Sequence, residues 1–309
     1  MKILITPRSF GKADPTVFDI LRNAKVEVVV NDTGGILDRD RLAELLSDCD
    51  GVVLGVDPLD ASVLARAPKL KAVAKYGVGV DNIDLGECEK RGIKVSRTVG
   101  ANSDAVADYA FALMLAAARR VVEIDARCRR KDWSNNNGLD VYGKTLGLIG
   151  FGAIGKRMAE RAKGFGMKVL AHDVFWDDSA AGVKKASPEE IYASADFISI
   201  HVPLTEDTRG MIGKEQLAAM KRGVVLINTA RGGIVDEDAL LEALKNKTIY
   251  GAGVDAFEEE PPSNPAWYEL GNVVLGSHAS ASTNGATGNM GRMAAANLLR
   301  DLGIAAEQA

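Results

Sequence analysis

A glycine-rich turn between an apolar strand and a helix constrains the fold of this chain more than any other feature. The segment LGLIGFGAIGKRMAERA places Gly150, Gly152 and Gly155 in a GxGxxG pattern after the apolar run 145–150. A bare GxGxxG is weak evidence, but here a helical pattern follows it, and a second strand pattern ends shortly before Asp173. This combination predicts a strand–turn–helix unit whose helix N-terminus binds the pyrophosphate of a dinucleotide.

Each member of the motif has a physical role in this interpretation. Gly150 permits the tight turn, Gly152 lets the backbone approach a pyrophosphate, and Gly155 lets the helix pack close to the strand. Asp173 is expected to accept hydrogen bonds from the adenosine ribose and to repel a 2′-phosphate, and no arginine follows it in DVFWDD. The sequence therefore favours NAD over NADP. In the alternative interpretation the glycines serve only as turns.

Short β-rich runs alternate with helical patterns along the whole chain, which predicts a parallel α/β architecture. The first series of expected strands is 2–6, 26–30, 51–55, 70–76 and 93–97. The second series is 145–150, 167–173, 196–202, 223–229, 248–255 and 272–277. One long helix is expected over about 103–131 and a last one over about 285–302. Two such series predict two domains, divided near residue 98; the last helix could return to either.

Composition excludes several classes of partner. A net charge of −4 over 309 residues gives no reason to expect binding to nucleic acid or to an anionic membrane. The apolar run 109–118 is about half of what a membrane span needs, and MKILIT leads into a strand pattern, so no signal peptide is expected. Cys49, Cys88 and Cys128 lack metal-type spacing and indicate reduced thiols in a cytoplasmic protein without a metal site.

Three candidate catalytic residues follow strands of the second series. Arg231, in NTARGG, lies where a buried strand ends, and a guanidinium there requires an anionic partner. Glu260 and His278 follow later strands, and the carboxyl ends of parallel strands meet at one edge. Glu260 could orient His278 and favour its protonated form for proton exchange with a substrate. Each also has a structural alternative. Arg231 could be an ordinary ion-pair partner, Glu260 part of a solvated acidic loop, and His278 a structural histidine.

Several motifs in order resemble those of the D-isomer-specific 2-hydroxyacid dehydrogenase family. The resemblance covers essentially the whole chain, and it is closest to the phosphoglycerate dehydrogenase branch in a short form without an added regulatory domain. The matching stretches are KYGVGVDNID (75–84), VGANSDAVADYAFALMLAAAR (99–119), KTLGLIGFGAIG (144–155), HVPLTEDTRGMI (201–212), INTARGGIVDEDAL (227–240) and GAGVDAFEEEPP (251–262).

The resemblance implies an NAD-dependent enzyme that moves a hydride between NAD(H) and a D-2-hydroxy acid or its 2-oxo acid. It implies that Arg231, Glu260 and His278 are catalytic. Arg231 would pair with the substrate carboxylate and 2-oxygen, and His278 would exchange the proton. The backbone N–H groups of Val78 and Gly79 would hold the carboxylate.

The resemblance also implies a fold and a set of cofactor contacts. A Rossmann NAD-binding domain (99–284) and a flavodoxin-like parallel-sheet substrate domain (1–98 plus 285–309) are expected, with a homodimer formed along the long helix. Asp255 would lie beside the nicotinamide carboxamide, and His201 would line the cofactor cleft. The implied cofactor residues are Gly150, Gly152, Ala153, Ile154, Gly155, Asp173, Pro203, Thr229, Ala230 and Asp255.

The chain departs from the family pattern beside the histidine and in one loop of the first domain. Family members commonly carry a proline before the histidine and a glycine two residues after it, whereas this chain has Ser277 and Ser280. The loop 55–61 carries Asp57 and Asp60 where phosphoglycerate enzymes usually carry arginine.

These two acids are expected to cost binding energy to a phosphorylated substrate. Arg8 or Lys75 could supply a cation instead. The substrate prediction therefore includes 3-phosphoglycerate but leaves lactate, glycerate, and sulfonated or branched hydroxy acids open.

Two rival functions share parts of this sequence pattern. A non-catalytic NAD(H)-sensing regulator of the corepressor type carries the same Arg-Glu-His set, but the long extra tails expected of it are missing here. Formate dehydrogenase pairs its histidine with glutamine, so Glu260 argues against it.

Overall fold

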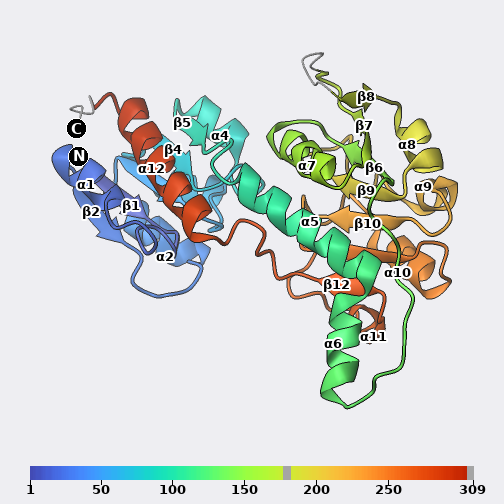
Figure 1. The fold of residues 1–309 in the computed structure, drawn as a ribbon. Helices are drawn as coiled ribbons and strands as arrows, with labels where there is room; N and C mark the ends of the chain where they lie inside the picture. Colours follow the sequence, from blue (N-terminus) through green and yellow to red (C-terminus); the bar gives the residue numbers. More distant parts are fainter. Residues whose placement is uncertain (177–181, 305–309) are drawn as a thin grey trace. The chain divides into compact units, whose positions relative to one another are not determined.

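The computed structural model describes residues 1–176 and 182–304, and the chain divides into two compact units (Figure 1). The N-terminal unit comprises Met1–Asn102 together with the chain from Ser282 onward, and the central unit comprises Ser103–Ala281. The domain boundaries expected from the sequence fell after residues 98 and 284, within a few residues of these divisions.

The N-terminal unit is built on a five-stranded parallel sheet with the order β2-β1-β3-β4-β5. The strands are β1 (Lys2–Ile5), β2 (Glu27–Val30), β3 (Gly51–Leu54), β4 (Ala72–Lys75) and β5 (Lys94–Arg97). This is the flavodoxin-like order, so the predicted fold class is confirmed for this unit.

Helices cover both faces of this sheet. They are α1 (Val17–Asn23), α2 (Arg39–Leu46), α3 (Ala61–Ala65), α4 (Leu85–Lys90) and α12 (Asn284–Asp301). Neighbouring strand residues point to opposite faces: Ile5 packs with Leu298 of α12, whereas Leu4 packs with Leu46 of α2. The last helix lies beside α1 (Figure 1) because its apolar side chains complete this core.

The central unit is built on a seven-stranded parallel sheet with the order β12-β11-β10-β9-β6-β7-β8. The strands are β6 (Thr145–Ile149), β7 (Lys168–His172), β8 (Val183–Lys185), β9 (Phe197–Ile200), β10 (Val225–Asn228), β11 (Gly251–Val254) and β12 (Val273–Leu275). Strand order reverses between β6 and β9, which is the Rossmann arrangement and a usual place for a ligand. The sequence did not predict β8, which is short and carries two exposed lysines instead of an apolar run.

Helices also cover both faces of the larger sheet, and β9, β10 and β11 are buried along their whole length. The helices are α5 (Ser103–Arg119), α6 (Val121–Arg129), α7 (Ala153–Gly164), α8 (Pro188–Ser194), α9 (Lys214–Ala219), α10 (Glu237–Lys245) and α11 (Ala266–Glu269). α5 and α7 pack together over one face, and α8, α9 and α10 cover the other.

The expected long helix over 103–131 is wrong, because the chain turns at Arg120. This residue has φ of 54° and ψ of 36°, a left-handed conformation that ends α5 and starts α6 in a new direction (Figure 1). α5 is held along its length by buried side chains, whereas α6 has none. The helical pattern alone could not reveal the break, since no glycine or proline marks it.

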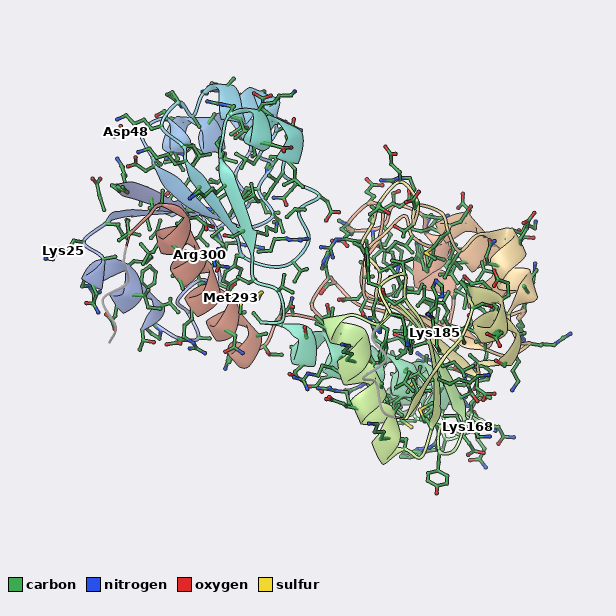
Figure 2. The ribbon with its side chains drawn as sticks, turned by 90° about the horizontal axis from the view of Figure 1, so that it is seen from above. Lys25, Asp48, Lys168, Lys185, Met293 and Arg300 are labelled. Atoms are coloured by element: carbon green, nitrogen blue, oxygen red, sulfur yellow. The ribbon has the colours of Figure 1, made fainter. Side chains whose placement is uncertain are left out.

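Charged side chains lie on the outside of both units. Lys25 and Asp48 of the N-terminal unit and Lys168 of the central unit are exposed and project from the ribbon in Figure 2. Throughout residues 1–176 and 182–304, no helix is long and apolar enough to cross a membrane. The same ranges hold no cluster of three or more His, Cys, Asp or Glu side chains able to hold a metal ion.

Candidate active site

The glycine loop folds tightly after β6. Gly150 has φ of +99°, and a Cβ there would lie 2.6 Å from the carbonyl carbon of His201, so only glycine fits. A Cβ on Gly155 would lie 2.3 Å from the carbonyl oxygen of Gly150, because α7 packs closely against the turn. At Gly152 a Cβ would meet nothing within 4 Å. The loop is therefore closed on its protein side and open where a pyrophosphate would approach.

Asp173 follows β7 and is held by backbone groups. Its Oδ2 accepts a hydrogen bond from the N–H of Phe151 at 2.6 Å, and its Oδ1 accepts one from the N–H of Phe175 at 2.8 Å. Trp176 stacks on Phe151 with ring centroids 5.4 Å apart, and the ammonium of Lys185 lies 5.6 Å from the Trp176 ring centre. These contacts place the carboxylate next to the glycine loop.

The other predicted cofactor residues lie near the same edge of the sheet. Ala153 and Ile154 open α7, whose first N–H groups have no partners within the helix and can receive an anion. Pro203 follows β9, and Thr229 and Ala230 follow β10. The buried hydroxyl of Thr229 has no hydrogen-bond partner within the described chain. An unpartnered buried hydroxyl at the carboxyl end of β10 suits a polar ligand such as a dinucleotide.

His201 is unsuited to proton exchange, because burial lowers its pKa to about 3. Its Nε2 lies 2.9 Å from the hydroxyl of Ser199. His172 contacts the protein through Nδ1, which lies 3.3 Å from the carbonyl oxygen of Ala186. Among the histidine side chains that the structure describes, His278 forms an ion-pair contact with a carboxylate, that of Glu260.

Glu260 and His278 are brought together from two different loops, one after β11 and one after β12. His278 Nδ1 lies 3.0 Å from Oε1 and 3.1 Å from Oε2 of Glu260. An ionised carboxylate can only accept, so Nδ1 carries the hydrogen and Nε2 remains to exchange a proton. Both side chains are more than one-third exposed, at 44% and 39%, so a ligand can reach the pair.

Asp255 holds the loop that carries His278. Its buried carboxylate accepts hydrogen bonds from the N–H groups of Ala279 at 3.0 Å and Ser280 at 2.9 Å, and its carbonyl oxygen accepts one from His278 N–H at 2.8 Å. A Cβ on Gly276 would lie 2.1 Å from this carboxylate, so the approach requires glycine. The same network supports the left-handed backbone of His278, at φ of 56°.

Arg231 lies on the loop after β10, half-buried at the edge of the core. Its guanidinium donates to the carbonyl oxygen of Ala230 at 2.7 Å. The next residue, Gly232, explains part of the NTARGG pattern: a Cβ there would lie 2.0 Å from the carbonyl carbon of Phe257. The backbone beside Arg231 therefore packs directly on the loop that leads to Glu260.

Asn228 is a site residue that the sequence did not single out. Its side chain accepts from Ala230 N–H at 3.0 Å and donates to the carbonyl oxygen of Arg231 at 2.9 Å, so it shapes the arginine loop. An amide as the last residue of a buried, otherwise apolar strand was the available signal, since such a group must find partners.

Val78 and Gly79 belong to the loop after β4 in the N-terminal unit. Gly77 starts this loop with φ of 141°, and its N–H donates to the hydroxyl of Thr98 at 2.9 Å. Within the part of the chain that the structure describes, the N–H groups of Val78 and Gly79 donate to no other group. They are suited to bind an anion.

The acidic loop of this unit uses its carboxylates internally. Asp57 is buried and accepts hydrogen bonds from the N–H of Leu37 at 2.8 Å and from the hydroxyl of Thr6. Asp60 caps α3 by accepting from the N–H of Val63 at 3.2 Å. Both acids are therefore accounted for by the fold of the N-terminal unit itself.

The two cations considered for a phosphate differ in position. Lys75 is buried, at 6% exposure, and its ammonium donates to the carbonyl oxygen of Gly55 and to Asn82 Oδ1 at 2.7 Å. It stabilises two loops of its own unit. Arg8 is exposed.

Comparison with known proteins shows the family of this chain. The family described as "D-isomer specific 2-hydroxyacid dehydrogenase, NAD binding domain" matches residues 111–280. The chain belongs to the D-isomer-specific 2-hydroxyacid dehydrogenase family. It is an oxidoreductase with NAD as its cofactor, and the glycine loop, the α7 N-terminus, Asp173 and the Thr229 hydroxyl fit that group.

Individual members of the family resemble this D-2-hydroxyacid dehydrogenase over most of its length. A glyoxylate reductase of Korarchaeum cryptofilum is 47% identical over 269 residues, covering 84% of this chain and 81% of the relative. A hydroxypyruvate reductase of Thermotoga maritima is 39% identical over 274 residues, covering 87% and 90%. A D-lactate dehydrogenase of Aquifex aeolicus, solved with NAD and lactic acid, is 30% identical with a TM-score of 0.84, covering 95% and 93%.

Proposed function

We propose that this enzyme reduces small 2-oxo acids with NADH, glyoxylate and hydroxypyruvate foremost. The observation that carries the proposal is the contact between the Glu260 carboxylate and His278 Nδ1, at 3.0 Å, beside the NAD-binding edge of the sheet. The choice of substrates is based on the relatives, since one is a glyoxylate reductase and another a hydroxypyruvate reductase. They favour these acids over the 3-phosphoglycerate considered from the sequence.

The proposed roles follow from the chemistry of each group. NADH, when bound, supplies the hydride. Arg231 pairs with the substrate carboxylate and polarises the 2-oxo oxygen, because a guanidinium forms charge-assisted, forked hydrogen bonds with such groups. We also assign the N–H groups of Val78 and Gly79, on the loop after β4, to binding a substrate carboxylate.

His278 is the proposed proton donor and acceptor. Protonated at both nitrogens, it donates from Nε2 to the oxygen on which negative charge develops as the hydride arrives, and in the reverse direction the neutral ring takes the proton back. Glu260 keeps Nδ1 protonated and stabilises the charged ring. Asp255, through its contacts with residues 278–280, sets the ring position, and we also assign it the place beside the nicotinamide carboxamide.

Turnover of NADH with a panel of 2-oxo acids tests this proposal. The panel contains glyoxylate, hydroxypyruvate, pyruvate, 3-phosphohydroxypyruvate and 3-sulfopyruvate. We expect the highest kcat/KM for glyoxylate or hydroxypyruvate. A preference for the phosphorylated acid would overturn the substrate assignment while keeping the chemistry, and absence of turnover with all five would contradict the enzymatic proposal.

Replacing Asp173 with asparagine is expected to weaken the preference for NADH over NADPH by about 10-fold, since a carboxylate repels a 2′-phosphate and an amide does not. Asparagine preserves the size of the side chain and one acceptor for the loop N–H groups. The measurement is kcat/KM for both cofactors, with Glu189→Gln on the surface of α8 as the control. An unchanged ratio in the Asp173 variant would remove this residue from cofactor selection.

We further propose that the enzyme is a homodimer in which a second copy covers α6. This helix has no buried side chain, and its residues Val121 and Val122 are 54% and 53% exposed. Trp133, which lies shortly after the helix, is 80% exposed. Burial of such side chains against a partner is favourable. Sedimentation equilibrium should give the mass of a dimer, and Val122→Glu should shift it toward the monomer. A monomeric wild-type enzyme at micromolar concentration would refute this assignment.

A further inference from the structure

The loop that carries Glu260 is tied to the start of α10. Glu237, the first residue of that helix, accepts a hydrogen bond from the N–H of Glu258 at 2.7 Å. The preceding N–H, of Phe257, donates to Oε1 of Glu260 at 3.1 Å. Two glutamates thus hold two successive N–H groups of the same loop.

This loop geometry bears directly on the catalytic pair. The Glu260 oxygen that accepts from Phe257 N–H is also the one that lies 3.0 Å from His278 Nδ1. The N–H groups of Phe257 and Glu258 belong to neighbouring peptides joined at the Phe257 Cα. A displacement of the Phe257–Glu258 peptide would therefore shift the adjacent Phe257 N–H, which orients the Glu260 carboxylate toward the imidazole.

The same peptide is enclosed by packing. A Cβ on Gly232 would lie 2.2 Å from the nitrogen of Glu258, so the arginine loop abuts it. The Phe257 ring packs edge-on against Trp267, with centroids 5.2 Å apart. Packing limits where this peptide can lie, but only a hydrogen bond sets the direction of its N–H, and Glu237 supplies that bond.

Glu237 is not required as a helix cap. Asp236 already caps α10 by accepting from the N–H of Ala239 at 2.9 Å. Burial raises the pKa of Glu237, and the charges of Glu258 and Asp238 act in the same direction, whereas the hydrogen bond from the Glu258 N–H and the polar side chain of Trp267 oppose the rise. Ionising this carboxylate therefore costs stability in the fold, and both groups that favour its charged form lie outside α10: Glu258 on the loop and Trp267, whose ring packs against Phe257 of the same loop.

We propose that Glu237 is a positioning residue for the Glu260–His278 pair. It fixes the Phe257–Glu258 peptide and so connects the arginine loop, which precedes α10, with the loop that carries the glutamate. The proposal rests on the proposed function, in which this pair transfers the proton.

The test compares Glu237→Ala with Glu237→Gln, because the glutamine oxygen can still accept the Glu258 N–H. Glu242→Ala is the matched control: it lies on the same helix, is exposed, and pairs with Lys214 at 3.1 Å. We expect Glu237→Ala to lower kcat for glyoxylate about 10-fold and to alter the pH dependence of kcat, with KM for NADH nearly unchanged. Glu237→Gln should restore kcat and the pH profile, and the control should match the wild type.

A second readout separates this proposal from the proposed function. The titration of the His278 imidazole, followed by NMR in the folded enzyme, needs no substrate and should differ between Glu237→Ala and wild type but not between Glu237→Gln and wild type. A wild-type titration in Glu237→Ala, or equal kinetic loss in the alanine and glutamine variants with unchanged thermal unfolding, would overturn the positioning role. Inactivity of the wild type on every 2-oxo acid would instead count against the function.

Discussion

Replacing Arg231 with alanine is expected to lower kcat/KM for glyoxylate by about 10²–10³-fold, the usual loss when one donor to a developing oxyanion is removed. The guanidinium lies on the loop after β10, at the carboxyl end of the central strands of the Rossmann sheet. It is proposed to contact the substrate rather than NAD. Binding of NADH, followed by its fluorescence, should therefore stay within about twofold of wild type.

Two further variants sharpen this experiment. Arg231→Lys keeps the charge but loses the planar fork, so an intermediate loss is expected. Arg222→Ala removes an exposed arginine of the same unit and should leave kcat/KM unchanged. Full activity in Arg231→Ala would disprove the mechanism, and loss of NADH binding in that variant would place Arg231 in the cofactor site instead.

Replacing His278 with asparagine is expected to lower kcat by about 10²–10⁴-fold, the range attributed to one positioned proton donor. Asparagine is chosen for the backbone, because His278 has φ of 56° and asparagine tolerates that left-handed conformation better than most residues. The fold should survive while the proton donor is lost. Steady-state reduction of glyoxylate across pH should then lose the limb that reports the imidazole.

His172→Asn provides the matched histidine control. Its ring contacts the carbonyl oxygen of Ala186 and is given no part in proton transfer, so at saturating NADH the kcat of this variant should be close to that of wild type. If His278→Asn kept its activity and its pH profile, proton transfer would have to be assigned to another group. Thermal unfolding of both variants excludes loss of fold as the cause.

Much of the fold and part of the candidate site could be predicted from local sequence. The alternation of strand and helix patterns predicted two parallel sheets, because strands buried on both faces must be apolar along their length. The GxGxxG spacing predicted the turn in which Gly150 and Gly155 make contacts that no other residue fits. Glu260 and His278 were selected because they follow strands, and the structure places them 3.0 Å apart.

Other features depended on contacts between segments far apart in the chain. Asp57 looked like an acid facing substrate, but it is buried against Thr6 and Leu37. Asp255 looked like a cofactor contact, and its carboxylate is seen holding residues 279 and 280. Sequence spacing cannot show which partner satisfies a carboxylate, since that depends on which loops meet.

Sequence alone thus determined the order of the elements, the glycine turn and the set of chemically able side chains, because these depend on local periodicity and residue type. Tertiary structure decided where α5 ends and α6 begins, which groups Asp57 and Lys75 bond to, and how Glu237 reaches the Glu260 loop. The physical reason is the same in each case. Buried polar groups must be paired, and their partners come from segments that only folding brings together.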